Sequence, residues 1–262
     1  MLTLLLFACS TEPAPVTTPA PVVEALNPEQ IAAAVDQALA PSPHETRLAV
    51  EKAGISLTFA TLLPERNYRF DNADIDRVAL RTGVILSDLV LAVKEAETPW
   101  LVDELQHLHD GLKAMGAEEG LLSTVADMKA GVENDSISRD ELLQQLDDII
   151  GMAPEGEGVG PDDSSGPLLQ AGAWLAGTNM TARAILRSGQ LDAADTLLRQ
   201  KAVAEYFLGY VSEGEGQEKA GELQALLKAT LENMIAVADQ ETIGREDIEG
   251  VRDQTQALVD LL

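Results

Sequence analysis

Apolar residues recur at steps of three and four positions along most of the chain after residue 40. This spacing puts the apolar side chains on one face of an α-helix. The most regular stripe consists of Ile75, Val78, Thr82, Ile85, Leu89 and Val93, and the next consists of Leu101, Leu105, Leu108, Leu112 and Met115. No stretch shows the strict alternation that a half-buried strand requires. The pattern therefore predicts an all-α protein made of helical bundles.

Helix-start and helix-stop signals separate these stripes. Two runs, Ser42-Pro43-His44-Glu45 and Ser138-Arg139-Asp140-Glu141, have the form of capping boxes. Asn72 is expected to cap the helix of the first stripe, and Gly116 is expected to end the second. The Ser42 box is expected to open a helix that ends at Gly54 or near Leu63. Further helices are expected over residues 31–39, 121–131, 142–151, 168–186, 190–211, 217–238 and 245–262.

Residues 154–167 are rich in Gly, Pro, Asp and Ser, which marks a linker. The linker predicts one helical bundle over residues 27–153 and a second over residues 168–262. The two halves resemble each other. Residues 135–142 match residues 241–248 in chemical type, and residues 82–86 match residues 171–175. These matches predict two related bundles from an internal duplication; the alternative is chance similarity between amphipathic helices. The small residues near Gly172 predict either a close helix crossing or a break.

The chain begins with a short, mainly apolar stretch from Leu2 to Ala8, which is followed by Cys9, the only cysteine of the chain. The run Leu6-Phe7-Ala8-Cys9 resembles the lipobox of bacterial lipoproteins. The resemblance implies that residues 1–8 are a signal peptide, that Cys9 carries the lipid, and that Ser10 directs the protein to the outer membrane. The apolar run is short and lacks an opening Lys or Arg, so we expect the true N-terminus to lie upstream. The alternative is that Cys9 is an ordinary thiol in an N-terminal tail.

Residues 9–26 are expected to form a tether, because the prolines between Thr11 and Val23 favour polyproline II. No later run approaches the roughly 20 apolar residues of a membrane helix, so the body is expected to lie outside the bilayer. Acylated Cys9 is then its attachment to the membrane.

The formal net charge is −26, from 44 acidic and 18 basic residues. Such a charge repels nucleic acid and anionic lipid head groups, so neither is an expected partner of the body. It attracts cationic peptides or divalent ions, but a solvated surface that keeps the protein in solution explains it as well. A single cysteine excludes an internal disulfide.

One group of residues has the composition of a metal site. Glu104 and His107 lie three residues apart and share a helix face, whereas His109, next to Asp110, points elsewhere. The remaining histidine is His44, on another predicted helix. Glu104 and His107 are therefore weak metal candidates; the alternative places them on the exposed side of the leucine stripe.

No nucleotide-binding glycine loop, nucleophile elbow or zinc-protease motif occurs in the sequence, so no cofactor and no enzymatic activity are expected. The leading hypothesis is a membrane-anchored binding or scaffolding module of the cell envelope, with an envelope protein as partner. The alternative is a binder of a small apolar ligand or a cation between the helical bundles.

Overall fold

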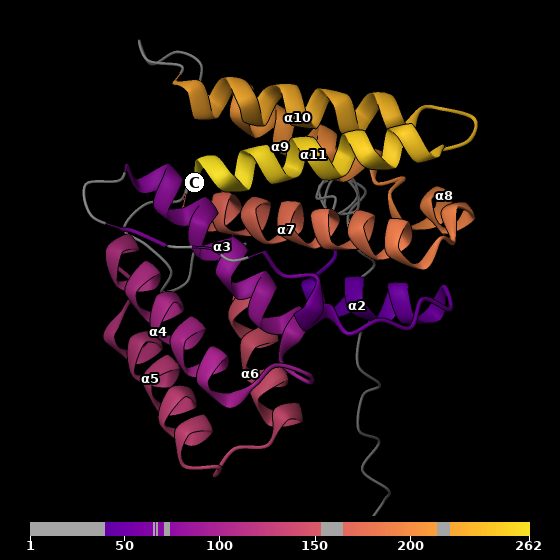
Figure 1. The fold of residues 1–262 in the computed structure, drawn as a ribbon. Coiled ribbons are helices and arrows are strands. Elements are labelled where there is room, and N and C mark those ends of the chain that lie inside the picture. The colour runs from indigo at the N-terminus through magenta and orange to yellow at the C-terminus, as the bar shows by residue number, and fades with distance from the viewer. Residues whose placement is uncertain (1–39, 65, 67, 71–73, 153–164, 214–220) are drawn as a thin grey trace, which may run out of the picture. The chain divides into compact units, whose positions relative to one another are not determined.

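The computed structural model describes residues 40–64, 66, 68–70, 74–152, 165–213 and 221–262. Every regular element in these ranges is a helix, so the all-α prediction is confirmed (Figure 1). The α-helices are α2 (Pro43–Lys52), α3 (Ile75–Ala92), α4 (Thr98–Met115), α5 (Glu119–Glu133), α6 (Arg139–Met152), α7 (Ser165–Ser188), α8 (Ala194–Leu197), α9 (Lys201–Glu213), α10 (Glu222–Ala238) and α11 (Arg245–Leu261). Two short 3-10 helices, η1 (Phe59–Thr61) and η3 (Leu191–Ala193), complete the set in the described ranges.

Several predictions made from the sequence concern residues outside the described ranges. They are the signal peptide with Cys9, the tether, the helix over residues 31–39, and residues 154–164 of the linker. Within the described part of the chain, none of the helices combines the length and the apolar composition that a membrane span requires.

The predicted helix signals are confirmed at three positions. Ser42 caps α2, with its hydroxyl accepting from the Glu45 amide and the Glu45 carboxylate accepting from the Ser42 amide. Ser138 and Glu141 form the same reciprocal pair before α6. Gly116 ends α4 in the left-handed conformation, with φ of 82°.

Other boundaries differ from the prediction. Asp74, not Asn72, caps α3, and its carboxylate accepts from the Arg77 amide at 2.9 Å. For α2 the nearer of the two predicted ends is confirmed and the end near Leu63 is wrong, because the helix stops at Lys52 and Gly54 follows with φ of 79°. The single helix expected over residues 190–211 is divided into η3, α8 and α9. α7 begins at Ser165, since proline at residue 167 is compatible with the first turn of a helix.

α3 and α7 form the centre of the fold. Every residue of α3 from Val78 to Ala92 is buried, and α7 is buried nearly all round from Ser165 to Ile185. The predicted stripe is buried from Val78 to Val93, but it is not the single buried face of α3. The reason is that α3 packs against α7, α4, α2 and α6 together, so it has no face left for solvent.

The remaining helices pack on either side of this central pair. On one side, α4 packs against α3 and α5 packs against α4 (Figure 1). On the other side, α11 packs against α7, α10 packs against α11, and α9 packs against α10. The largest apolar cluster runs through helices of both predicted bundles. Residues 38–262 accordingly form one compact unit. Independent folding of the two halves, and their origin by duplication, stay predictions.

Candidate functional site

The structure brings two of the sequence candidates together on α4. The Glu104 Oε2 and His107 Nδ1 atoms lie 3.6 Å apart. His109 instead lies beside Asp110, with Nδ1 and Oδ1 3.4 Å apart, and His44 is on α2. Glu104 is only 8 % exposed, so the alternative that placed it on the exposed side of the helix is wrong. In the described ranges no three His, Cys, Asp or Glu side chains are grouped so that they could hold a metal ion.

Glu104 belongs to a buried ionic cluster that sequence reasoning missed. Arg66 Nη1 donates to Asp88 Oδ2, and the same guanidinium nitrogen donates to the Tyr68 hydroxyl at 3.4 Å. The Tyr68 hydroxyl donates to Asp88 Oδ2 at 3.3 Å, and its ring packs edge-on against His107 with the centroids 5.3 Å apart. We call Arg66, Tyr68, Asp88, Glu104 and His107 the buried cluster.

Three elements position these side chains. Asp88 is on α3, within a run of mainly apolar residues. The helices packed around α3 bury this run on all sides. Glu104 shares the stripe of Leu101, Leu105 and Leu108 on α4, and the packing of that stripe against the core buries its carboxyl. Arg66 and Tyr68 precede α3 and reach across to both helices.

Burial dominates the electrostatics of the cluster. Burial, reinforced by the Asp88 carboxylate, raises the pKa of Glu104 to about 8. Burial also raises the pKa of Asp88, although Arg66 and Tyr68 act against this rise. Glu104 is therefore mainly protonated and neutral at pH 7, and Asp88 is the carboxyl in direct contact with the Arg66 guanidinium.

The cluster is incompletely satisfied by hydrogen bonds. Five of its buried atoms have no hydrogen-bond partner, namely Arg66 Nε and Nη2, Asp88 Oδ1, Glu104 Oε2 and His107 Nδ1. Unpaired polar atoms in a buried site cost free energy. Chemically, the protonated Glu104 is a proton donor next to a histidine and a guanidinium, in a site with little access for solvent.

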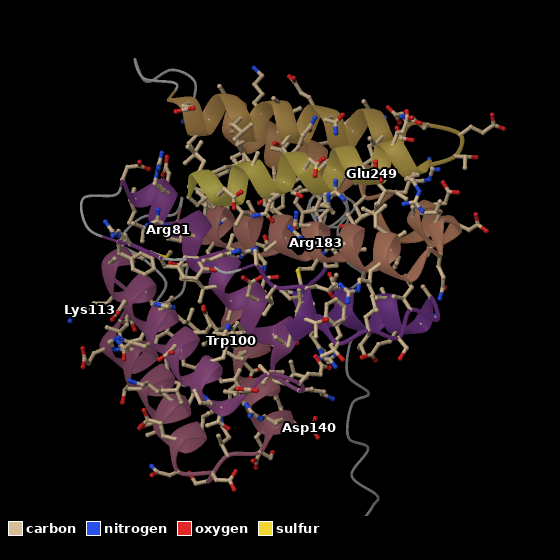
Figure 2. All side chains as sticks on the ribbon, in the orientation of Figure 1. Arg81, Trp100, Lys113, Asp140, Arg183 and Glu249 are labelled. Carbon is tan, nitrogen blue, oxygen red and sulfur yellow. The ribbon has the colours of Figure 1, made fainter. Side chains whose placement is uncertain are left out.

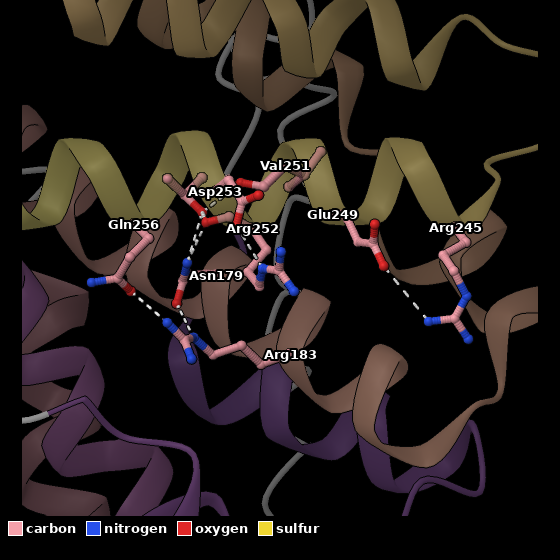
Figure 3. A network of polar contacts seen from close by, with 9 residues as sticks. Asn179, Arg183, Arg245, Glu249, Val251, Arg252, Asp253 and Gln256 are labelled. Carbon is pink, nitrogen blue, oxygen red and sulfur yellow. Dashed lines mark hydrogen bonds and ion pairs between the residues drawn. The ribbon is translucent and has the colours of Figure 1, made fainter.

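A second polar network joins α7 to α11 (Figure 3). The Asn179 amide donates to the Arg252 carbonyl at 2.8 Å and to the Thr255 hydroxyl at 3.0 Å. Arg183 donates from Nε to Asn179 Oδ1 and from Nη2 to Gln256 Oε1, both at 2.8 Å. Burial, with the nearby Arg252 cation, lowers the pKa of Arg183. These four hydrogen bonds pair side chains of α7 with groups of the same network, and three of them join α7 directly to α11. They therefore help to fix the position of α11 on α7.

The surface contrasts with these buried groups. Asp140, at the start of α6, projects away from the helices, and its partner Lys94 Nζ lies 3.1 Å from Oδ1 (Figure 2). Its side chain is 83 % exposed, so this pair contributes little to stability.

A pocket of about 750 Å³ lies between α2 and the segment from the end of α7 to α8. Its wall on α2 includes Glu45 and Lys52, the opposite wall includes Asp192 and Leu197, and Thr181 of α7 also lines it. Residues 49, 53 and 193 on its two walls are alanines, whose short side chains fill little of the space. A volume of this size accommodates a small organic molecule.

Comparison of the chain with protein-family models, with curated proteins and with solved structures found no match.

Proposed function

We propose that this protein is a lipid-anchored, non-enzymatic binding or scaffolding module of the bacterial cell envelope. One observation carries the proposal: Cys9, the only cysteine, follows an apolar run and directly precedes a proline-rich spacer. A lipid on Cys9 needs a spacer if the helical body is to work away from the bilayer. A polyproline II segment the length of residues 10–26 reaches up to about 50 Å.

The charge of the chain supports this arrangement. A body with a formal net charge of −26 is repelled by anionic head groups. The lipid would therefore hold the protein at the membrane while its body faces the aqueous compartment. The partner expected for such a surface is an envelope protein with a cationic face.

The test is to express Cys9→Ser from the gene's own start and to separate membranes from soluble protein. We expect the variant to leave the membrane fraction, whereas Ser10→Ala, a matched change at the next residue, stays in it. Membrane fractionation of Cys9→Ser equal to that of the wild type would contradict the proposal.

The pocket favours a second candidate function, the binding of a small amphipathic molecule. Its lining combines charged side chains such as Glu45 and Lys52 with apolar ones such as Leu197. Protein purified from native membranes would be examined by native mass spectrometry for a bound small molecule. We expect Ala49→Trp, which fills the pocket, to lose that mass. Leu48→Trp, one position along α2 and 49 % exposed, should keep it. Identical spectra for the two variants would contradict this second function.

A further inference from the structure

The buried cluster holds a short segment against two helices. Arg66 and Tyr68 come from the stretch between η1 and α3, and Phe70, two residues further on, packs near Gly111 of α4. The guanidinium carbon of Arg81, on α3, lies 5.6 Å from the centroid of the Phe70 ring. We call Arg66, Tyr68 and Phe70 the strap residues. They contact Asp88 and Arg81 of α3 and His107 of α4.

The buried charges balance only if one carboxyl is neutral. Asp88 is 3 % exposed and Glu104 is 8 % exposed, and the guanidinium that pairs within the cluster is that of Arg66. With Glu104 protonated, the Arg66–Asp88 pair is balanced. With both carboxyls ionised, the cluster holds two negative charges against one guanidinium in a buried setting.

The charged and titratable groups around Glu104 come from all the elements of the cluster. Arg66 and Tyr68 approach it from the strap, Asp88 from α3, and His107 and Asp103 from its own helix. Asp103 is exposed and lies outside the cluster. The favourable charge that an ionised Glu104 would meet inside the cluster is that of Arg66, which Asp88 already engages.

We infer that Glu104 is a proton-sensitive latch: its neutral form keeps Arg66 and Tyr68 seated on α3 and α4, and its ionisation loosens them. The incomplete hydrogen bonding of the cluster makes the latch weak enough to respond, since Arg66 already has two buried nitrogen atoms without partners. Opening exposes Glu104 to water and lets its charge be solvated.

The raised pKa of Glu104 defines the pH range of the effect. The carboxyl has its ordinary value of 4.5 when it is solvated and about 8 when it is buried. Ionisation therefore favours the opened state progressively above pH 4.5, until both states are ionised above pH 8. Between pH 6 and pH 9, the equilibrium constant for opening should rise by up to about 100-fold.

The experiment is hydrogen–deuterium exchange of the full chain at several pH values, corrected for the intrinsic exchange rate. Peptides that contain Arg66 and Tyr68 should lose protection in the wild type as the pH rises from 6 to 9, while peptides from the centre of α7 stay protected. Glu104→Gln, which keeps the shape without the titration, should hold those peptides protected throughout.

Two matched variants separate the latch from its neighbours. Asp103→Asn removes the adjacent exposed carboxylate, and His107→Gln removes the neighbouring imidazole, and both should keep the pH dependence of the wild type. Protection of the strap peptides that does not change with pH in the wild type would overturn the inference. So would a pH dependence that persists unchanged in Glu104→Gln.

Discussion

Gly83 of α3 and Gly172 of α7 stand in a reciprocal relationship where the two helices cross. A Cβ added to Gly83 would lie 1.9 Å from the carbonyl oxygen of Leu169, three residues before Gly172. A Cβ added to Gly172 would lie 2.0 Å from the carbonyl oxygen of Leu80, three residues before Gly83. Each glycine therefore admits the backbone of the other helix, and side chains larger than hydrogen cannot be placed at either position without separating α3 from α7.

This relationship predicts that Gly172→Ala strongly destabilises the protein. The new methyl group meets backbone, which cannot move aside, so the loss should be about 3 kcal/mol or more in urea unfolding followed by circular dichroism. Gly177→Ala is the matched control on the same helix, because its nearest neighbour would be the Thr46 hydroxyl at 3.7 Å. That variant should be neutral or slightly stabilised. Equal losses for the two variants would show that the crossing is looser than described.

The sequence predicted the all-α architecture and most of the helix ends, because capping residues act within a few positions of one another. Ser42 with Glu45 and Ser138 with Glu141 are local pairs of this kind. The expected close crossing near Gly172 is also confirmed. It was not predictable that Gly83 is the partner, since a helix pattern does not say which helices meet.

The buried cluster was missed for the same reason. Its members lie on segments separated in sequence, with Arg66 and Asp88 22 residues apart. A local signal did exist, since Asp88 is a lone charge in the apolar run of residues 84–93. Glu104 likewise falls on the stripe of buried leucines, at positions three and four from Leu101 and Leu108. A charge at such a position indicates either a buried partner or a shifted pKa.

The proposed duplication gains two structural parallels. Gly83 and Gly172 are the second residues of the matching segments 82–86 and 171–175. Before α11, the Asp247 carboxylate accepts from the Gly244 amide at 2.8 Å, as the Glu141 carboxylate does from the Ser138 amide before α6. The duplication stays a prediction.

Glu104 should lower the stability of the protein at neutral and alkaline pH. Its pKa is raised from 4.5 to about 8 in the fold, so the folded state binds the proton more tightly than the unfolded state. The contribution of Glu104 to the stability is then greatest below pH 4.5 and is lost as the pH rises towards 8. We expect Glu104→Gln to exceed the wild type by about 3 kcal/mol more at pH 8 than at pH 5 in urea unfolding. A difference that is the same at both pH values would contradict the raised pKa.

Asn179 should matter more to stability than Gln256, the other side chain that accepts from Arg183. Asn179 is fully buried and donates twice to α11, so Asn179→Ala should cost about 2–3 kcal/mol of unfolding free energy. Gln256→Ala also removes a partner of Arg183, but at a half-buried position, and should cost less than about 1 kcal/mol. Thermal unfolding of the two variants beside the wild type tests this order, and a larger loss for Gln256→Ala would reverse the assignment.

The linker and the shared core make a prediction about limited proteolysis. Proteases are expected to cut first within residues 154–164, because this stretch before α7 is rich in Gly, Pro and Ser. The two fragments should stay together, since α3 from one and α7 from the other bury each other. Gel filtration of the cut protein measures this. Fragments that separate and remain helical would show two independent bundles instead of one shared core.

The most direct test of the lipid-anchored account is the intact mass of the protein extracted from the membranes of its native host. The account predicts a chain that begins at Cys9, with the mass of residues 9–262 increased by a diacylglyceryl group, with or without a further acyl chain on the amine. A mass that retains residues 1–8, or an unmodified Cys9 thiol, would contradict it.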